Sequence, residues 1–520
     1  MMNPNPPPTS SSLQLASILV ARFLRSNNYT QTLEAFIREA GLPPDAGQVG
    51  GGGAGSGDDD DGWTIEGVIE EKRAFDQSLK FERYGEGDDG REKWSVPAPS
   101  KPTIIQTPSP SNLLSVSVEP WRRSSGAEGE EEETTTVSPY IVATGADRRL
   151  NLFKTADGHD VAASFSGLSD SPILSHASVR GGTYQLITNM SGQLLLLRDS
   201  QILDRRKDHT KYAVKVVTYE VEDKDRDEGS SSKVWVATAG WDAKILIYRM
   251  TIAMSEGSSP SPPSIGEPVA SIKLATNPES ILFVRSTAES KDLMLLASRR
   301  DSTFLYYYEV EPPAAAAAAG VEEEGGRGRK PYECRLLGKQ NLAPHSHAWV
   351  TFSPSCFALS PRDPGLLAVA TSTLPHMKVM IVRLLFPSLE SVDHAAVAAV
   401  SAELEMQASR ARAELALQNR EDAAILIQAN TLVPQTAYST PQVVWRPDGS
   451  GLWVNGDDGV IRGIEAKTGK VVATLKDGHE AGSKVRTIWA GWVGGPGENG
   501  QREEWVLSGG FDKRLIVWKV

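Results

Sequence analysis

Most of the chain alternates short apolar runs with clusters of turn-forming residues, which is the pattern of β-strands joined by tight turns. The clearest runs are rich in β-branched and aromatic residues and lie at 140–144, 234–239, 293–298, 366–371 and 505–508. This texture extends from about residue 101 to residue 520, with low-complexity insertions such as Pro312–Lys330. Surface loops tolerate such insertions at small entropic cost, so the whole region is expected to be all-β.

Before residue 101 the apolar spacing is that of helices. Residues 13–41 place apolar side chains three and four positions apart, with a break at Asn27-Asn28, which predicts two short helices. A further amphipathic helix is expected over 64–84. The intervening segments are polar or rich in Gly and Pro, so they predict a disordered start and two linkers, at 1–12, 42–63 and 85–100.

The β-rich region contains an internal repeat. The pattern Gly-x-Asp-x-x-Leu/Ile begins at Gly145, Gly240, Gly456 and Gly510, and a weaker copy surrounds Asp301. Each copy follows one strand-like run and precedes another, so it predicts a tight turn whose aspartate bonds to turn amides. The five expected turn aspartates are Asp147, Asp242, Asp301, Asp458 and Asp512.

Two copies share a longer register. A histidine stands 33 residues before the aspartate, a Ser or Thr four residues before it, and an aromatic residue six residues after it. The two sets are His209, Thr238, Asp242 and Tyr248, and His479, Ser508, Asp512 and Trp518. They resemble the WD-repeat family of β-propellers, in which these residue types form a buried hydrogen-bonded chain within a blade. The resemblance implies a structural role for both sets.

The same resemblance implies a seven-bladed propeller over residues 101–520. Seven strand groups can be counted, with inner portions beginning near Leu113, Ile173, Tyr212, Ser280, Trp349, Gln442 and Lys484. The last group ends after its third strand. The β-rich run 103–107 has no group of its own, so we expect it to supply the missing strand and close the ring without a long exposed edge.

Residues 13–41 resemble the LisH motif, a short helical dimerisation unit. The matching positions are Leu15, Ile18, Phe23, Leu24, Tyr29, Thr32, Leu33, Phe36, Glu39 and Ala40. Helices this short are marginal alone in water, so a second copy of the hairpin is expected to complete the core of a homodimer. The expected dimerisation residues are Leu15, Ile18, Leu19, Phe23, Leu33, Phe36 and Ile37. The alternative is that the hairpin docks on its own propeller.

The predicted fold class is therefore an all-β seven-bladed WD-repeat propeller with a small N-terminal α-helical LisH module. A helical pattern interrupts the propeller at 389–418, where a blade needs only a tight turn. The run contains no Gly or Pro, and its apolar face comprises Val397, Val400, Leu404, Ala411 and Leu415. This helix is either a docking element for a partner or packs on the side of the propeller, and the sequence leaves both open.

Composition narrows the possible partners and compartments. The formal net charge of -12 repels phosphate backbones, so we expect no nucleic-acid partner. Two cysteines are too few for a disulfide framework, and the chain shows neither a signal-peptide pattern nor an apolar run long enough to span a membrane. The expectation is a cytoplasmic and/or nuclear protein with no membrane association.

The sequence predicts binding rather than catalysis. His209 and His479 with their neighbours imitate a hydrolase triad, but the arrangement recurs at fixed spacing in two repeats, which favours a structural network. We expect no catalytic residue, metal or cofactor. The predicted function is a dimeric scaffold or adaptor for protein or peptide partners, and the resemblance suggests ubiquitin-ligase or corepressor-type complexes. The alternative is a propeller enzyme with a pocket in the central channel, but the polar residues it needs on several inner strands are not recognisable in the sequence.

Overall fold

The computed structural model describes residues 10–47, 64–66, 94, 97–125, 134–156, 158–221, 232–252, 263–286, 292–311, 331–344, 352–387, 415–494 and 502–520. The chain divides into two compact units, Met1–Gly90 and Arg91–Val520. The described part of the first unit is helical, and that of the second consists mainly of β-strands.

A helical hairpin forms the first unit. Its helices are α1 (Ser10–Ser26) and α2 (Thr30–Ala40). The chain reverses at Asn28, whose left-handed φ of 59° is one that asparagine tolerates. Gly41 ends α2 with a φ of 65°, and its N–H donates to the Ile37 carbonyl. Helix α1 begins inside the segment that we expected to be disordered, because serine residues are well suited to the first turn of a helix.

The core of the hairpin includes residues beyond α2. Ala21 from α1, Leu33 from α2 and Ala46 are buried, and Leu42 packs against them. The Arg25 guanidinium donates to the Ala46 carbonyl at 3.1 Å and so fixes this segment to α1. The chain as far as Gly47 therefore belongs to the helical unit, and the linker predicted from residue 42 begins too early.

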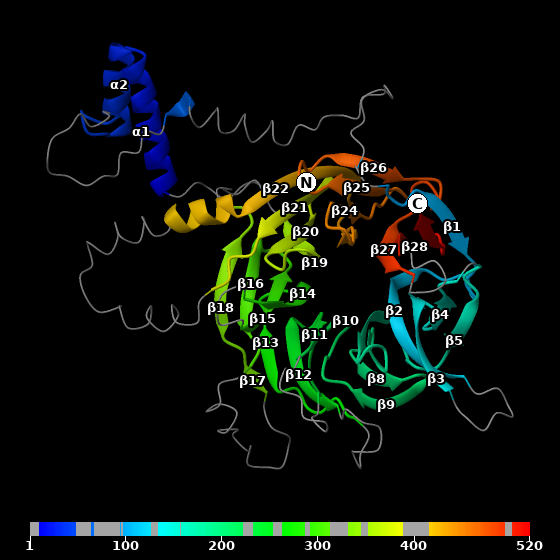
Figure 1. Cartoon of the computed structure of the whole chain (residues 1–520). Coiled ribbons are helices and arrows are strands. Elements are labelled where there is room, and N and C mark those ends of the chain that lie inside the picture. Colours follow the sequence, from blue (N-terminus) through cyan, green and yellow to red (C-terminus); the bar gives the residue numbers. More distant parts are fainter. Residues whose placement is uncertain are drawn as a thin grey trace, which may run out of the picture. The chain divides into compact units, whose positions relative to one another are not determined.

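The second unit contains seven sheets arranged around a central axis (Figure 1). Blade 1 comprises β2 (Leu113–Ser125), β3 (Thr134–Gly145), β4 (Leu150–Lys154) and β5 (Val161–Phe165). Blade 2 comprises β6 (Ile173–Val179), β7 (Tyr184–Asn189), β8 (Leu194–Arg198) and β9 (Gln201–Arg206). Blade 3 comprises β10 (Ala213–Glu220), β11 (Ser232–Gly240), β12 (Lys244–Ile252), β13 (Ala270–Lys273) and a parallel fifth strand, β17 (Tyr332–Glu333).

The remaining blades have four strands each. Blade 4 comprises β14 (Pro278–Arg285), β15 (Leu293–Arg299), β16 (Phe304–Glu309) and β18 (Leu336–Asn341). Blade 5 comprises β19 (Ser353–Leu359), β20 (Leu366–Ser372), β21 (His376–Arg383) and β22 (Ile425–Pro434). Blade 6 comprises β23 (Val443–Trp445), β24 (Gly451–Val454), β25 (Ile461–Glu465) and β26 (Val471–Leu475). Blade 7 comprises β27 (Val485–Val493), β28 (Glu503–Gly510), β29 (Leu515–Lys519) and β1 (Lys101–Ile105).

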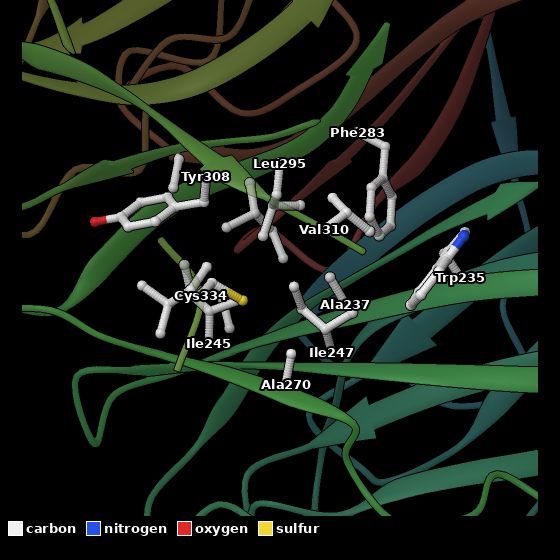
Figure 2. Close-up of a cluster of buried hydrophobic side chains, with 14 of the residues drawn as sticks. Trp235, Ala237, Ile245, Ile247, Ala270, Phe283, Leu295, Tyr308, Val310 and Cys334 are labelled. Atoms are coloured by element: carbon white, nitrogen blue, oxygen red, sulfur yellow. The ribbon is translucent and has the colours of Figure 1, made fainter. Parts of the chain in front are cut away.

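The first strand of each blade contacts the first strands of the two neighbouring blades, so these seven strands form a closed inner ring. The unit is a seven-bladed β-propeller, and this prediction from the sequence is confirmed. Hydrophobic clusters lie between the blades. Figure 2 shows one, in which Ala237 and Ile247 of blade 3 meet Leu295 and Phe283 of blade 4. Each sheet is covered on both faces, which accounts for the nearly continuous apolar runs in the sequence.

Strand β1 completes the last blade. It pairs antiparallel with β29, with Thr103 opposite Val517 and Ile105 opposite Leu515. It ends at Ile105, two residues before the end of the run predicted at 103–107, because the chain turns at Thr107, whose hydroxyl donates to the Ser109 carbonyl at 3.1 Å. The two ends of the propeller are therefore held in one sheet, and β29 is not an open edge.

The described part of 85–100 is packed on the propeller, so the expectation of a linker is wrong there. The Trp94 ring lies 4.9 Å from the Trp453 ring in an edge-to-face arrangement, and the Arg446 guanidinium lies 4.4 Å from the Trp94 ring centre. Arg446 is fully buried and pairs with Glu504 at 2.6 Å. The indole buries a large apolar area, and Arg446 Nη2 also donates to the Pro97 carbonyl at 3.1 Å, so both contacts attach this segment to the propeller.

Two predicted helices fall mostly outside the described residues. Of the helix predicted over 64–84, residues 64–66 are described, and Ile65 and Glu66 are helical. Of the insertion predicted over 389–418, the described part begins at Leu415 and is helical over 415–423.

Candidate functional site

Blade 7 contains a buried chain of four hydrogen-bonded side chains. Trp518 Nε1 donates to Ser508 Oγ at 2.9 Å, and Ser508 Oγ lies 2.8 Å from His479 Nε2. The other ring nitrogen of His479, Nδ1, lies 2.9 Å from Asp512 Oδ2. With Nδ1 protonated, each group donates to the next, from the indole N–H to the carboxylate. The structure therefore brings together all four residues that the sequence pattern selected in this blade.

The Asp512 carboxylate anchors this chain. Burial would raise its pKa, but hydrogen bonds from His479 and from the backbone amide of Glu480 hold the pKa of Asp512 below its usual value. The Arg514 amide, within the turn itself, also donates to this carboxylate at 3.2 Å. One charged group thus ties the turn between β28 and β29 to the segment that enters the blade.

Blade 3 repeats the inner part of this arrangement. His209 Nε2 lies 2.9 Å from Thr238 Oγ1, and His209 Nδ1 lies 2.9 Å from Asp242 Oδ1. Tyr248 interacts with Thr238, as the expected chain requires, and its hydroxyl also donates to Asp208 Oδ2 at 3.1 Å. The Asp208 carboxylate is thus an additional partner that the repeat pattern does not reveal.

Two further turn aspartates bond to turn amides without a histidine. Asp147 accepts from the Arg149 amide at 3.3 Å and from the Ser109 hydroxyl at 2.6 Å. Asp458 accepts from the Val460 amide at 3.2 Å. These turns are capped locally, whereas those of blades 3 and 7 are also connected to the blade interior.

The role expected for Asp301 is wrong. Asp301 is exposed and has a left-handed φ of 58°. The turn amide of Phe304 donates instead to Ser302 Oγ at 3.3 Å. In the copies at Asp147, Asp242 and Asp512, the residue with a left-handed φ follows the aspartate. In this turn Asp301 itself has the left-handed φ, and Ser302 accepts from the turn amide in place of the aspartate.

The glycine of the Gly-x-Asp pattern is required by the same geometry. In all four copies, a Cβ atom on this glycine would overlap the carboxylate of the aspartate two residues later. At Gly240 and Gly510 it would also press against the histidine ring of the same blade. The glycine of the repeat is therefore required by the position of the turn aspartate.

The turns between second and third strands all lie on one face of the propeller, beside the start of each blade's first strand. In three copies of the pattern, the amide of the residue between Gly and Asp donates to the carbonyl that precedes the first strand. These donor–acceptor pairs are Trp241–Tyr212, Phe511–Lys484 and Ala146–Asn112, each at 2.9 Å. We name this surface, formed by the turns and the segments entering each blade, the turn face.

The turn face carries exposed aromatic side chains. Trp241 and Phe511 are each 41% exposed although they sit between a buried glycine and a hydrogen-bonded aspartate. The Tyr212 ring lies 5.2 Å from the Trp241 ring, and Tyr438 on the segment entering blade 6 is also exposed. Aromatic side chains on a rigid backbone are typical anchors of protein interfaces, so this surface is the candidate binding site.

In blades 2 and 6, asparagine side chains bond to backbone groups near the turn between the second and third strands. The repeat pattern does not include these asparagines. Asn189 Oδ1 accepts from the Gln193 amide at 2.9 Å, across the turn between β7 and β8. Asn455 Oδ1 accepts from the Gln442 amide at 2.7 Å, and its Nδ2 donates to the Val485 carbonyl at 2.7 Å. The available signal was an asparagine placed directly before the turn in both blades.

Polar side chains also meet on the inner strands of blades 1 and 2. Ser117 Oγ lies 2.7 Å from His176 Nε2. Burial, together with the smaller effect of the nearby charge of Lys215, lowers the pKa of His176 to about 4. Burial raises the pKa of Glu119 to about 7, against the opposing effect of its hydrogen bond with Ser117. Polar residues of this kind on the inner strands are not recognisable from the sequence pattern.

The expected dimerisation residues lie along the helical hairpin. Leu33 is buried in its core, and the side chain of Leu15 lies outside the described residues. The others are half-buried, namely Ile18, Leu19, Phe23, Phe36 and Ile37. Tyr29 is 53% exposed although its ring lies 6.4 Å from that of Phe23. The hairpin thus leaves much of its apolar stripe partly open to solvent.

The candidate docking helix is described only at its C-terminal end. Val397, Val400, Leu404 and Ala411 lie outside the described residues, and Leu415 is 46% exposed. Glu421 is buried and accepts from the Asn341 amide of β18 at 2.7 Å. Burial raises the pKa of Glu421, and this hydrogen bond opposes that rise. The last turn of the helix is therefore attached to the outer strand of blade 4.

Within the described residues, no group of three or more His, Cys, Asp and Glu side chains is arranged to hold a metal ion. None of the helices in that part of the chain is long and apolar enough to cross a membrane.

Comparison with family models gives two matches, both to domains described under UCP007778. Residues 14–44 match its LisH domain, and residues 351–490 match its beta-propeller domain. The protein is a LisH domain followed by a seven-bladed β-propeller. The LisH match covers most of α1, all of α2 and the residues that fold back on them, and the propeller match covers blades 5 and 6 and most of β27. Comparison with curated proteins gives no match.

Proposed function

We propose that the protein is a non-catalytic scaffold or adaptor that pairs through its LisH domain and binds protein or peptide partners on the turn face. A propeller joined to a LisH domain fits a protein-interaction scaffold in general. The observation that carries the proposal is the pair of exposed aromatic side chains, Trp241 and Phe511, on turns held by buried His–Asp contacts. Side chains fixed before binding lose little conformational entropy on association, so they suit the role of anchors.

The family resemblance extends this proposal. Blade 7 contains the full series of hydrogen-bonded Trp, Ser, His and Asp side chains, and blade 3 contains its Thr, His and Asp part. Both observations favour classification of these blades as WD repeats. Proteins that combine this repeat with a LisH unit include components of ubiquitin-ligase and corepressor complexes. We place the protein in such an assembly, in the cytoplasm or the nucleus.

A comparison of surface variants tests the binding site. The full-length protein, the double variant Trp241→Ala with Phe511→Ala, and the single variant Trp492→Ala are purified with their partners from cells and compared by quantitative mass spectrometry. Trp492 is a matched control, because it is 43% exposed and lies near the opposite end of β27. We expect the double variant to lose partners that the control retains. An identical set of partners for all three proteins contradicts the proposal.

Catalysis at the propeller axis is the second candidate function. The contact between Ser117 and His176 resembles a nucleophile with its general base. However, the other ring nitrogen of His176 faces the Ser115 hydroxyl at 3.4 Å rather than a carboxylate. A ring with a pKa of about 4 is also a weak base at neutral pH. These two features favour a structural role for the pair, and the scaffold has the stronger support.

A further inference from the structure

Three side chains from the inner strands of non-adjacent blades lie near the same end of the propeller axis. Lys215 lies on β10 of blade 3, Cys356 on β19 of blade 5, and Arg486 on β27 of blade 7. All three strands belong to the inner ring. Blade 4 lies between the first two, blade 6 between the last two, and blades 1 and 2 lie between β27 and β10. The positive charges of Lys215 and Arg486 nevertheless both act on the Cys356 thiol. Cys356 Sγ lies 3.9 Å from Gln442 Oε1 and 3.9 Å from the Val443 carbonyl oxygen, at the start of the inner strand of blade 6.

The strand register places the three residues at the same end of the axis. Lys215 and Cys356 directly follow the bulge near the start of their strands, and Arg486 is the bulged residue itself. On the neighbouring strands, Lys215 is opposite Ala239, and the residue before Arg486 is opposite Gly510. These neighbours directly precede the turns that carry the exposed aromatic side chains. The group therefore lies just inside the turn face.

The two cations lack an acidic partner in the part of the chain that the structure describes. Lys215 is exposed and Arg486 is half-buried, and neither makes an ion pair or side-chain hydrogen bond with a described residue. The acid at the corresponding bulge of blade 4, Glu279, is already held by Arg300 at 2.8 Å. Two positive charges without an acidic partner among the described residues therefore act on one thiol, in a chain whose formal net charge is -12.

We propose that this group is a binding site for a phosphate group, held between Lys215 and Arg486 with the Cys356 thiol beside it. The site goes beyond the proposed scaffold function, because it lies on the axis and does not use the exposed aromatic side chains.

The chemistry of the three side chains favours a dianionic oxyanion. The planar guanidinium of Arg486 can donate two parallel hydrogen bonds to one oxyanion, and the Lys215 ammonium supplies a second full charge from another blade. Burial raises the pKa of the Cys356 thiol, so at neutral pH it remains protonated and does not repel an anion. Burial also lowers the pKa of Arg486, and a bound anion offsets that destabilisation of its charge.

Calorimetric titration of the full-length protein with inorganic phosphate tests the site, with chloride at matched ionic strength as the blank. The variants are Lys215→Gln and Arg486→Gln, and the control is Lys211→Gln, an exposed lysine on the segment entering blade 3. We expect saturable binding that weakens about tenfold or more in each of the two variants, since each removes charge-assisted hydrogen bonds, and that is unchanged in the control. The variant Arg486→Lys, which keeps the charge, should retain more affinity than Arg486→Gln.

Two outcomes overturn the proposal. One is the absence of saturable phosphate binding by the unmodified protein. The other is an equal loss of affinity in Lys211→Gln, which shows adsorption to surface charge rather than a site. Thiol alkylation gives a readout that does not depend on affinity: phosphate should slow the modification of Cys356 and leave that of Cys334, the second cysteine, unchanged. An unchanged rate at Cys356 contradicts the placement of the anion beside it.

A second titration distinguishes a phosphorylated side chain of a partner protein from a free phosphate or small phosphate ester. A peptide of mixed sequence with one phosphoserine and the same peptide without phosphate are compared with inorganic phosphate. Tighter binding of the phosphopeptide indicates a modified side chain of a partner protein, whereas equal or weaker binding indicates a free phosphate or small phosphate ester. The double variant Trp241→Ala with Phe511→Ala should bind inorganic phosphate normally, so failure of the turn face as a partner site leaves this proposal intact.

Discussion

Single buried polar groups determine how firmly the turns of blades 3 and 7 are held. In His479→Ala, Ser508 loses its acceptor and Asp512 loses its main side-chain donor in a fully buried site. An unsatisfied buried group typically costs about 1–3 kcal/mol, so we expect the free energy of unfolding to fall by that amount in chemical denaturation. His376→Ala is the control, because His376 is half-buried and has no side-chain hydrogen bond within the described residues. Equal effects of the two substitutions contradict a structural role for the chain.

Two groups on the inner strands, His176 and Glu119, are expected to change the stability of the fold in opposite directions as the pH falls. The folded-state pKa of His176 is about 4, below its ordinary 6.5, so the unfolded chain takes up the proton first and stability is lost as the pH falls from 6.5 to 4. The folded-state pKa of Glu119 is about 7, above its ordinary 4.5, so stability is gained as the pH falls from 7 to 4.5. Between pH 7 and pH 5, each group changes the free energy of unfolding by about 2 kcal/mol, and the two changes have opposite sign.

Variants separate these two contributions. On acidification from pH 7 to pH 5, Glu119→Gln should lose about 2 kcal/mol of unfolding free energy relative to the unmodified protein, because the effect of His176 is no longer offset. His176→Asn should gain about the same amount over that range. Urea denaturation at both pH values measures the difference, and the other titrating groups cancel in the comparison. If both variants keep the pH dependence of the unmodified protein, these two groups are not perturbed as described.

Among the elements, β1 has the largest expected effect on stability relative to its length. A chain that begins at residue 110 leaves β29 as an exposed edge, whereas a chain that begins at residue 91 keeps β1 and Trp94. We expect the shorter chain to aggregate or to melt at a clearly lower temperature. Trp94→Ala in the longer chain separates the contribution of the docked indole from that of the strand. Equal melting temperatures of the two chains would show that closure contributes nothing.

The helical hairpin gives a prediction about assembly. Ala21, Leu33 and Ala46 form a small core, and the half-buried Phe36 lies at its border. We expect light scattering of the full-length protein to show a dimer, and Phe36→Asp to be a monomer with an intact propeller. Gln31→Asp, an exposed position on α2, should remain dimeric. A monomeric unmodified protein is the result that favours docking of the hairpin within one chain.

For the molecule as a whole, the features that could be predicted from the sequence are those that depend on locally repeated residues. The number of blades and the role of β1 follow from the spacing of strands and Gly-x-Asp turns. The residues on the axis could not be predicted, because a bulge near the start of most inner strands shifts the alternation by one residue and changes which side chains face inward. Lys215 and Arg486 are single residues in different blades, and no local pattern connects them.

Closure of the ring by β1 also has a consequence for synthesis on the ribosome. The side chain of Lys101 bonds to the carbonyl of Val520, and these two residues are 419 positions apart in the chain. At roughly 5–20 residues per second, β29 emerges about 20–80 s after β1. During that interval the first strand to be made has no partner and the incomplete ring keeps an open edge. The time spent in this state scales with translation speed, so slow codons late in the message lengthen the period in which the nascent chain needs protection from aggregation.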